Sequence, residues 1–372
     1  MHFSIEKEIF LKGLSRVQGI VEKKNTIPIL SNVLLHADGS HLQITATDLE
    51  VGMQATYPAS VTKPGRITVP AKKLFEIIKE LPESEIFFTA KDNSWIEIRC
   101  GKSIFNIVGL SADEFPFFPS IEEDDFIVIE SHKIKELIEK TVFSMSTDET
   151  KYNLNGIFIK IIEEDGTKKI RFVATDGHRL SLKDTPFEGI AAENLEKGVI
   201  FPKKGVIELR KMADEADGPI HLGFMDNNAV LKKNNSIIIM RIVDGEFPDY
   251  NRVIPKNNNL NSIIDRNNFL HALRRMSILS SEKSKGVKID FKTDFLELSS
   301  SNPDLGDARE DLSAEYDGED VSIGFNARYL IDILSSLDSE KICFSVKDQL
   351  SPGLIKSVSD NEYLAVIMPM RL

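Results

Sequence analysis

The chain has few of the residues that cross-link small secreted proteins or bind metals. Only two of its 372 residues are cysteines, Cys100 and Cys343, and they stand far apart. Isolated cysteines predict neither a disulfide framework nor a metal site, and they fit a reducing cytosol. The seven histidines are scattered without metal-ligand spacing. We therefore expect no metal, no cofactor and a cytoplasmic location.

Long apolar runs are absent as well. The longest aliphatic run lies around Ile237–Met240 and is far too short to span a bilayer. The first residues contain no apolar signal core, so we expect no membrane partner. Hydrophobic residues make up 41% of the chain and charged residues 28%, which is typical of a soluble globular protein.

The motifs of common enzyme classes are also missing. Gly101-Lys102-Ser103 is similar to the end of a phosphate-binding loop, but Ile96 stands where that loop requires a glycine. The chain has no His-Glu-x-x-His, no Gly-x-Ser-x-Gly and no dinucleotide-binding glycine pattern after a strand. The net charge of −12 argues only weakly against a nucleic-acid partner, because the placement of charge matters more than its total.

The chain contains instead a repeat of domain size. Three times a helix-like segment precedes alternating strands, a second helix and further strands. Asp48 and Asp176 occupy equivalent places 128 residues apart, and Asn302 follows Asp176 by 126 residues. A period near 130 residues far exceeds that of solenoid units. We predict three tandem modules covering residues 1–124, 125–256 and 257–372.

Each module is predicted to place two helices on antiparallel sheets. Apolar residues at helical spacing predict helices over residues 6–24, 70–81, 131–146, 202–213, 265–285 and 326–338. Short alternating strands with frequent turn residues favour antiparallel sheets over βαβ units, and hence an α+β fold. The Pro-, Asp- and Asn-rich segments 116–125 and 248–260 are expected to link the modules.

Basic residues gather in the predicted helices. The six helical ranges carry nine more basic than acidic residues, whereas the remainder carries 21 more acidic than basic residues. A basic set of helices on an acidic protein suits a DNA-facing surface, since Lys and Arg release counterions from phosphates. The alternative explanation is that Lys and Arg are simply good helix formers. The last helix, with Arg328 against Asp332 and Asp338, fits that alternative.

One polar cluster, Ala174–Leu180, interrupts the repeat. Its Thr175-Asp176 pair has a counterpart in Thr47-Asp48, so we interpret this pair as a structural turn. Gly177, His178 and Arg179 have no such counterpart and are candidates for function. Asp176 and His178 could alternatively provide acid–base chemistry, which makes a hydrolase the alternative hypothesis.

The C-terminus is the second unusual feature. Met368-Pro369-Met370 follows an apolar strand and ends the sequence without a solubilising tail. Two methionines flanking a proline suit an adaptable hydrophobic binding surface. The alternative is a last strand that only completes its sheet, which we expect of Tyr363–Ile367.

Four segments carry a resemblance to a known family, and the similarity runs through the whole chain in matching order. The chain resembles the bacterial DNA sliding clamps, the beta subunits of DNA polymerase III. The segments are Ala174–Leu180, Phe201–Leu209, Val243–Tyr250 and Met368–Leu372.

The resemblance implies half of a six-domain homodimeric ring. In such a ring helices line a hole that encircles double-stranded DNA, irrespective of its sequence, and sheets form the outer wall. The ring tethers the polymerase catalytic subunit and has no catalysis of its own. The clamp loader and other proteins with a clamp-binding motif are the further partners implied.

The resemblance also implies two sets of site residues. The hydrophobic pocket for partner peptides should include Thr175, Gly177, His178, Arg179, Leu180, Pro248, Arg252, Val253, Val366, Met368, Pro369, Met370, Arg371 and Leu372. The candidate DNA-facing residues are Lys24, Lys151, Tyr152, Lys203 and Lys204. We add Lys72 and Lys73 because they belong to the basic helices.

Two positions depart from the family pattern. Lys24 stands where the family often has an arginine, which keeps the charge but loses a bidentate fork. Asn153 stands where some relatives have a second aromatic residue. A scaffold that binds only proteins and never DNA remains a further alternative.

Overall fold

The computed structural model describes residues 1–21, 27–119, 121, 126–189, 192–215, 218–280 and 285–371. The chain divides into two compact units, Met1–Ser131 with Lys204–Ile242 and His132–Lys203 with Val243–Leu372. Helices pack on antiparallel sheets in both units, which confirms the predicted α+β class. No helix in the described ranges is long and apolar enough to cross a membrane.

The first unit contains a five-stranded and an eight-stranded sheet. In spatial order, the smaller sheet has β5 (Ser60–Lys63), β1 (His2–Glu6), β7 (Glu85–Ala90), β8 (Trp95–Cys100) and β9 (Ser103–Val108). The larger sheet has β10 (Ile127–Glu130), β15 (Pro219–Met225), β16 (Asn228–Lys233), β17 (Ser236–Arg241), β4 (Val51–Pro58), β3 (His41–Thr47), β2 (Asn32–Asp38) and β6 (Gly65–Pro70). The helices are α1 (Lys7–Val17), α2 (Ala71–Glu80) and, apart from its first residue, α5 (Lys203–Asp214).

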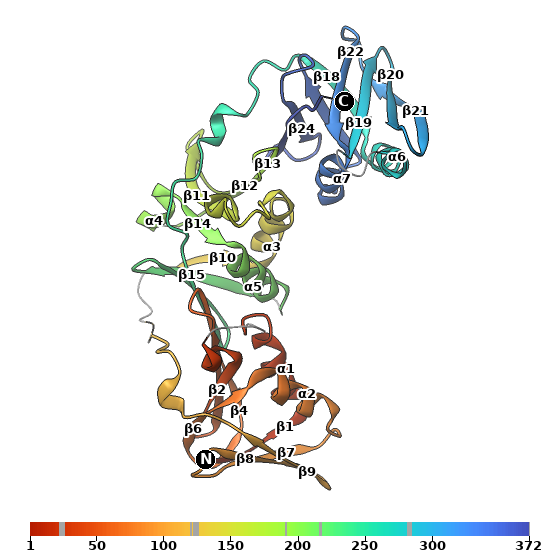
Figure 1. Ribbon diagram of the computed structural model, residues 1–372. Helices are drawn as coiled ribbons and strands as arrows, with labels where there is room; N and C mark the ends of the chain where they lie inside the picture. Colours follow the sequence, from red (N-terminus) through yellow and green to blue (C-terminus); the bar gives the residue numbers. More distant parts are fainter. Residues whose placement is uncertain are drawn as a thin grey trace. The chain divides into compact units, whose positions relative to one another are not determined.

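The second unit contains a single sheet of 12 strands. Its spatial order is β14 (Val199–Pro202), β11 (Gly156–Glu164), β12 (Thr167–Thr175), β13 (Arg179–Pro186), β25 (Tyr363–Ile367), β24 (Gly353–Ser357), β23 (Lys341–Val346), β18 (Leu260–Asp265), β21 (Gly306–Glu315), β20 (Phe295–Asn302), β19 (Gly286–Lys292) and β22 (Val321–Asn326). The helices are α3 (Ser131–Glu139, from its second residue), α4 (Glu193–Lys197), α6 (Arg266–Ile278) and α7 (Ala327–Ser336). Figure 1 shows α6 and α7 side by side against β19 and β22.

Strand pairing joins neighbouring thirds of the sequence. In the first unit β4 pairs with β17 through five residue pairs, from Val51↔Met240 to Ala55↔Ser236. In the second unit β13 pairs with β25 through another five, from Arg179↔Ile367 to Lys183↔Tyr363. Each large sheet is therefore continuous across a junction between repeats.

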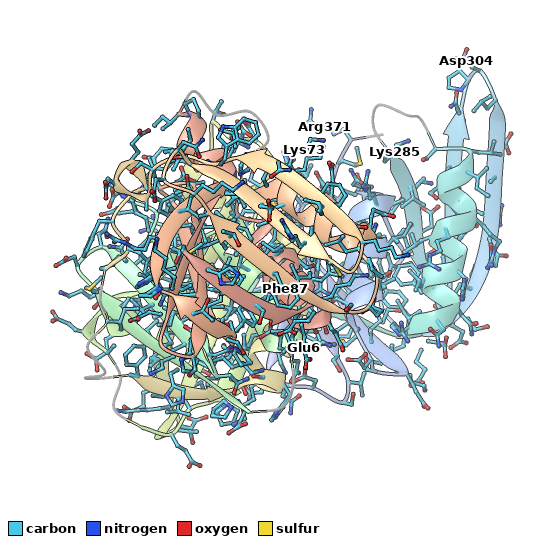
Figure 2. All side chains as sticks on the ribbon, turned by 90° about the horizontal axis from the view of Figure 1, so that it is seen from below. Glu6, Lys73, Phe87, Lys285, Asp304 and Arg371 are labelled. Atoms are coloured by element: carbon cyan, nitrogen blue, oxygen red, sulfur yellow. The ribbon has the colours of Figure 1, made fainter. Side chains whose placement is uncertain are left out.

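Among the strands with an unpaired backbone edge in the described residues are β9 and β21. β9 ends the five-stranded sheet, with Ile104 and Val108 each about half exposed. β21 pairs with β18 only at Ala314 and Glu315, so its earlier residues pair on one side alone, with β20. Asp304 lies at the tip of the β20–β21 hairpin (Figure 2).

The six predicted helices begin within one residue of their predicted starts, whereas the short helix α4 was not predicted. Pro70 precedes α2 directly, and prolines favour this place because a first-turn N–H has no helical partner. The side chain of Asp265 accepts a hydrogen bond from Asn268 N at 2.7 Å and caps α6, and the side chain of Asn326 caps α7. The apolar faces of α6 and α7 are fully buried in the core of the 12-stranded sheet.

Three helices end earlier than predicted. α1 ends at Val17 rather than at residue 24, just before a glycine, Gly19, which favours helix termination. α3 ends at Glu139, and Thr141 Oγ1 then donates to the carbonyl of Leu137 at 2.7 Å before a 3₁₀ turn. α6 ends at Ile278, and residues 281–284 lie outside the described ranges.

Candidate functional site

The Thr175–Arg179 turn is held by its own side chains. Asp176 Oδ1 accepts hydrogen bonds from the amides of His178 and Arg179 at 2.9 and 3.0 Å. The amide of Gly177 donates to Thr175 Oγ1, and Gly177 adopts a φ of +92°. A left-handed backbone at this point suits glycine, which has no Cβ to clash.

The first third of the chain contains the same turn. The amide of Leu49 donates to Thr47 Oγ1 at 3.0 Å, and the amide of Glu50 donates to Asp48 Oδ1 at 2.9 Å. Leu49 has a φ of +78°, which is unusual for a side chain with a Cβ. The prediction that the Thr-Asp pair is a structural frame is confirmed.

Arg179 connects this turn to the third repeat. Its side chain is 9% exposed and pairs with Asp176 Oδ2 at 3.1 Å and with Asp332 Oδ2 on α7 at 2.6 Å. The guanidinium also lies 4.4 Å from the ring centre of Tyr329, a cation–π contact. Burial and the Asp176 carboxylate raise the pKa of Tyr329, while Arg179 opposes the shift.

The Asp176 carboxylate therefore has a structural role. Both of its oxygens accept hydrogen bonds from the turn or from Arg179. The His178 ring stacks instead on Tyr329, with 6.5 Å between ring centres. This arrangement gives no support to an Asp176–His178 acid–base pair.

An apolar groove of about 170 Å³ lies beside the turn. Its floor is one row of the 12-stranded sheet, in which Leu180 pairs with Thr175 on one side and with Val366 on the other. The segment from Pro248 to Val253 forms the opposite wall. The groove is lined by Leu154, Thr175, Gly177, Arg179, Leu180, Pro248, Asp249, Tyr250, Val253, Val366 and Met368.

Eight residues predicted for the peptide pocket line this groove. They are Thr175, Gly177, Arg179, Leu180, Pro248, Val253, Val366 and Met368. Of the others, Arg252 is exposed and pairs with Asp249, and His178 lines a neighbouring groove. Pro369 and Met370 are half-buried, Arg371 is exposed, and Leu372 lies outside the described residues.

Sequence reasoning missed Leu154, Asp249 and Tyr250. Asp249 and Tyr250 directly follow Pro248 in a segment expected to act as a linker, and Tyr250 is in fact buried. The segment thus contributes a buried side chain to the groove, a role that the linker prediction did not include. The aromatic Tyr250 was the available signal, because solvent-exposed linkers seldom carry large buried rings.

The C-terminal residues are fastened at two points. The amide of Met368 donates to the carbonyl of His178 at 2.9 Å. The amide of Met370 donates to the carbonyl of Gly324 on β22 at 2.8 Å. The tail thus lies across the turn and β22, past the end of β25 at Ile367.

A second, more polar groove of about 810 Å³ adjoins the turn. Its basic lining side chains include two predicted DNA contacts, Lys151 and Lys203, and two that were not predicted, Lys285 and Arg328. Three carboxylates, Asp148, Asp176 and Asp332, also line it. Such a surface can bind anions where its basic side chains extend beyond the carboxylates with which they pair.

The remaining candidate DNA-binding residues differ in how exposed their side chains are and in whether they are already paired. Lys72 and Lys73 on α2 are 70% and 72% exposed, and both lie near Glu76 (Figure 2 labels Lys73). Tyr152 is 59% exposed. By contrast, the Lys204 ammonium pairs with Asp48 and donates to the carbonyl of Ile20 at 2.8 Å.

Lys24 lies outside the described residues, so its predicted DNA contact stays a prediction. Within the described ranges, no group of three or more His, Cys, Asp or Glu side chains could hold a metal ion.

Comparison with known proteins gives consistent matches along the chain. Family models of the DNA polymerase III beta subunit match its N-terminal domain at residues 1–119, its central domain at 128–249 and its C-terminal domain at 251–371. The beta sliding clamps of Caulobacter vibrioides and Escherichia coli are 37% and 35% identical over the full length of both chains.

Solved structures agree with these matches. A Caulobacter crescentus beta sliding clamp superposes with a TM-score of 0.94 at 37% identity. A Bartonella birtlesii sliding clamp bound to griselimycin superposes with a TM-score of 0.95, also at 37% identity. Both alignments cover all of each chain.

Proposed function

The chain belongs to the family of DNA polymerase III beta subunits, the bacterial sliding clamps, and we propose that two copies form a ring around duplex DNA. The family is a non-catalytic accessory subunit, a processivity factor. The ring would tether the polymerase catalytic subunit and other proteins that carry a clamp-binding motif. Because it acts on chromosomal DNA, we place it in the cytoplasm.

We propose three domains with boundaries at residues 1–124, 125–256 and 257–372. Each begins with a short strand that leads directly into a helix: β1 into α1, β10 into α3 and β18 into α6. In each, a later helix of ten or more residues directly follows a strand: α2 after β6, α5 after β14 and α7 after β22. This shared order of elements supports the repeat.

The apolar groove beside the Thr175–Arg179 turn is the observation that supports the proposal of partner binding. Relatives from two organisms have been solved with griselimycin bound. We propose that the groove takes griselimycin and short partner peptides whose apolar side chains fit between Leu180 and Val253. Titration of a fluorescently labelled griselimycin tests this, and a probe that fails to saturate at micromolar protein would contradict it.

Encirclement is tested by the topology of the DNA. A clamp loaded by a clamp loader should stay on nicked circular DNA and slide off once a restriction enzyme linearises it. Gel filtration of labelled protein with each DNA form measures the retained fraction. Equal retention on both forms would indicate ordinary binding, and no retention on either would favour a scaffold that never touches DNA.

The basic helices are expected to contribute weak phosphate contacts. The triple variant Lys12→Glu/Lys72→Glu/Lys73→Glu should load on circular DNA about tenfold less well at low salt, because reversed charges repel phosphate. The deficit should shrink as salt rises, since exposed charges are screened. A control with the same charge change, Lys63→Glu/Lys168→Glu/Lys256→Glu, alters exposed lysines outside helices and should load normally. Equal losses of loading in both variants would indicate that the total charge of the protein, and not its placement on the helices, controls loading.

A further inference from the structure

Asp332 is joined to the apolar groove through Arg179. It lies on α7 and lines the polar groove, and its Oδ2 accepts a hydrogen bond from Arg179 Nη1 at 2.6 Å. Arg179 lines both grooves, since it stands where the Thr175–Arg179 turn meets β13. A carboxylate of the third repeat is therefore connected to a residue of the second repeat that borders the apolar groove.

The Arg179 guanidinium has an acceptor for each of its three nitrogens. Nε donates to Asp176 Oδ2 at 3.1 Å, Nη1 donates to Asp332 Oδ2, and Nη2 donates to the carbonyl of Phe143. The guanidinium also lies 4.4 Å from the ring centre of Tyr329 on α7. Because the Arg179 side chain is only 9% exposed, the loss of one acceptor leaves a buried donor unsatisfied. Of the three acceptors only Asp332 belongs to the third repeat, so this carboxylate ties the turn to α7.

The carboxylate of Asp332 has a counterpart in each repeat. The sixth residue of α2, of α5 and of α7 is acidic: Glu76, Glu208 and Asp332. Glu76 pairs with Lys73 at 2.8 Å and Glu208 pairs with Lys211 at 2.7 Å, each within its own helix. In the described part of the chain, Asp332 is thus the one member of this set whose ion pair crosses a junction between repeats.

The first junction has no counterpart of the arginine. Val51 follows the aspartate of the first turn at the place that Arg179 has in the second. The ion pair across this junction has the opposite direction, because Lys204 of α5 pairs with Asp48 of the turn. Glu208 Oε2 is buried and has no hydrogen-bond partner among the described residues. The acidic residue therefore belongs to the common frame of the helix, whereas its pairing with an arginine of the turn occurs at the junction that contains the apolar groove.

The turn that Arg179 anchors also holds other parts of the groove. Thr175 and Gly177 line the groove from the turn itself. The carbonyl of His178 accepts a hydrogen bond from the amide of Met368 at 2.9 Å, and Met368 lines the groove as well. A shift of the turn away from α7 would therefore displace Met368 together with the turn.

We propose that Asp332 is a positioning residue for partner binding: it holds the Arg179 guanidinium on α7 and so fixes the turn and Met368 in the arrangement that the ligand requires. The proposal rests on the apolar groove being the partner site. A wall that is fixed before binding spares the ligand the free energy of ordering it. Without the carboxylate only a fraction of molecules has the wall in place, and the apparent affinity falls by that fraction.

A double-mutant cycle tests whether Asp332 acts through Arg179. Asp332→Asn keeps the size of the side chain but removes its charge, and it should weaken binding of the fluorescent griselimycin about fivefold. In the background of Arg179→Met, which keeps an unbranched side chain beside the groove, the same change should have no further effect. Asp332→Glu keeps the carboxylate and should restore most of the affinity. Unchanged affinity of Asp332→Asn, or an equal loss in both backgrounds, would overturn the proposal.

A matched control uses another ion pair across the same junction. Lys183 lies on β13 four residues after Arg179 and pairs with Asp360 at 2.7 Å. Their side chains are 7% and 28% exposed, against 9% and 31% for Arg179 and Asp332. Because Lys183 and Asp360 are not among the described residues that line either groove, Asp360→Asn should leave the affinity unchanged. An equal loss in this variant would show that pairing between the repeats in general controls binding, and would contradict a specific role of Asp332.

Hydrogen exchange separates the anchor from the assignment of the groove. The amide of Met368, which donates to the turn, should exchange faster in Asp332→Asn than in the wild-type protein, while the amides of β20 and β21 should exchange as before. A wild-type protein that did not bind griselimycin would refute the groove as the partner site, and faster exchange at Met368 would then still show that the anchor exists. Unchanged exchange at Met368 would refute the anchor, whatever the affinity.

Discussion

Deletion of residues 368–372 is expected to abolish binding of the fluorescent probe, with a loss of at least about 100-fold, and to leave the dimer intact. Met368 forms one wall of the groove, and its amide holds the carbonyl of His178. The deletion removes that wall and also the bond from Met370 to Gly324. The sheet should survive, because β25 ends at Ile367.

Two point variants locate the effect within the tail. Met368→Ala removes only the side chain in the groove and should account for much of the loss, whereas Arg371→Ala changes an exposed side chain and should be close to neutral. Sedimentation velocity checks the oligomer, and fluorescence anisotropy checks the affinity. A deletion variant that became monomeric would show that the tail mainly stabilises the dimer.

Charges placed on β9 are expected to separate the dimer. β9 is a free sheet edge with exposed apolar side chains, and such edges pair readily with another strand. The one-sided stretch of β21 is also a free edge, and the exposed Leu305 flanks it. We propose that β9 of one copy pairs with β21 of the other.

The variant Ile104→Asp/Val108→Asp tests this edge. Both side chains are about half exposed in the single chain, so the substitutions should not disturb its core. Burying two carboxylates at the interface is strongly unfavourable, and the dimer dissociation constant should rise at least about 100-fold. Sedimentation at micromolar concentration should then give the 41.8 kDa chain, and retention on circular DNA should be lost.

A matched control uses the edge strand of the other sheet in the same unit. Val128 on β10 is also about half exposed, so Val128→Asp introduces the same chemistry away from the proposed interface. This variant should remain dimeric. Dissociation of both variants, or of neither, would contradict the assignment of β9.

The sequence was sufficient to predict the fold class, because it contains the same pattern three times. Apolar spacing in the segments that became α2, α5 and α7 placed their bounds within about two residues. Three helices were predicted too long. These predictions failed where local chemistry ended a helix before its apolar pattern ended. Ile20 is buried beyond the end of α1, so its apolar character indicated burial rather than helix.

The candidate site was predicted less completely, for a physical reason. Thr175 and Leu180 were predicted through the resemblance to the sliding clamps, which rests in part on the segment Ala174–Leu180. Tyr250 was harder to find, because its burial depends on packing against Leu182 and Val366, which lie far from it in the sequence. Lys204 shows the opposite case: its position suits DNA, but its ammonium is engaged by Asp48.

The strand pairs that cross the repeat junctions bear on how a closed ring could admit DNA. Pulling apart β4 and β17, or β13 and β25, would break a five-residue ladder together with the core packed on it. Five backbone pairs buried within a sheet open far more rarely than an edge contact between separate molecules. In the proposed ring the gate therefore lies at a seam between copies, so the lifetime of the clamp on DNA is set by the lifetime of that seam.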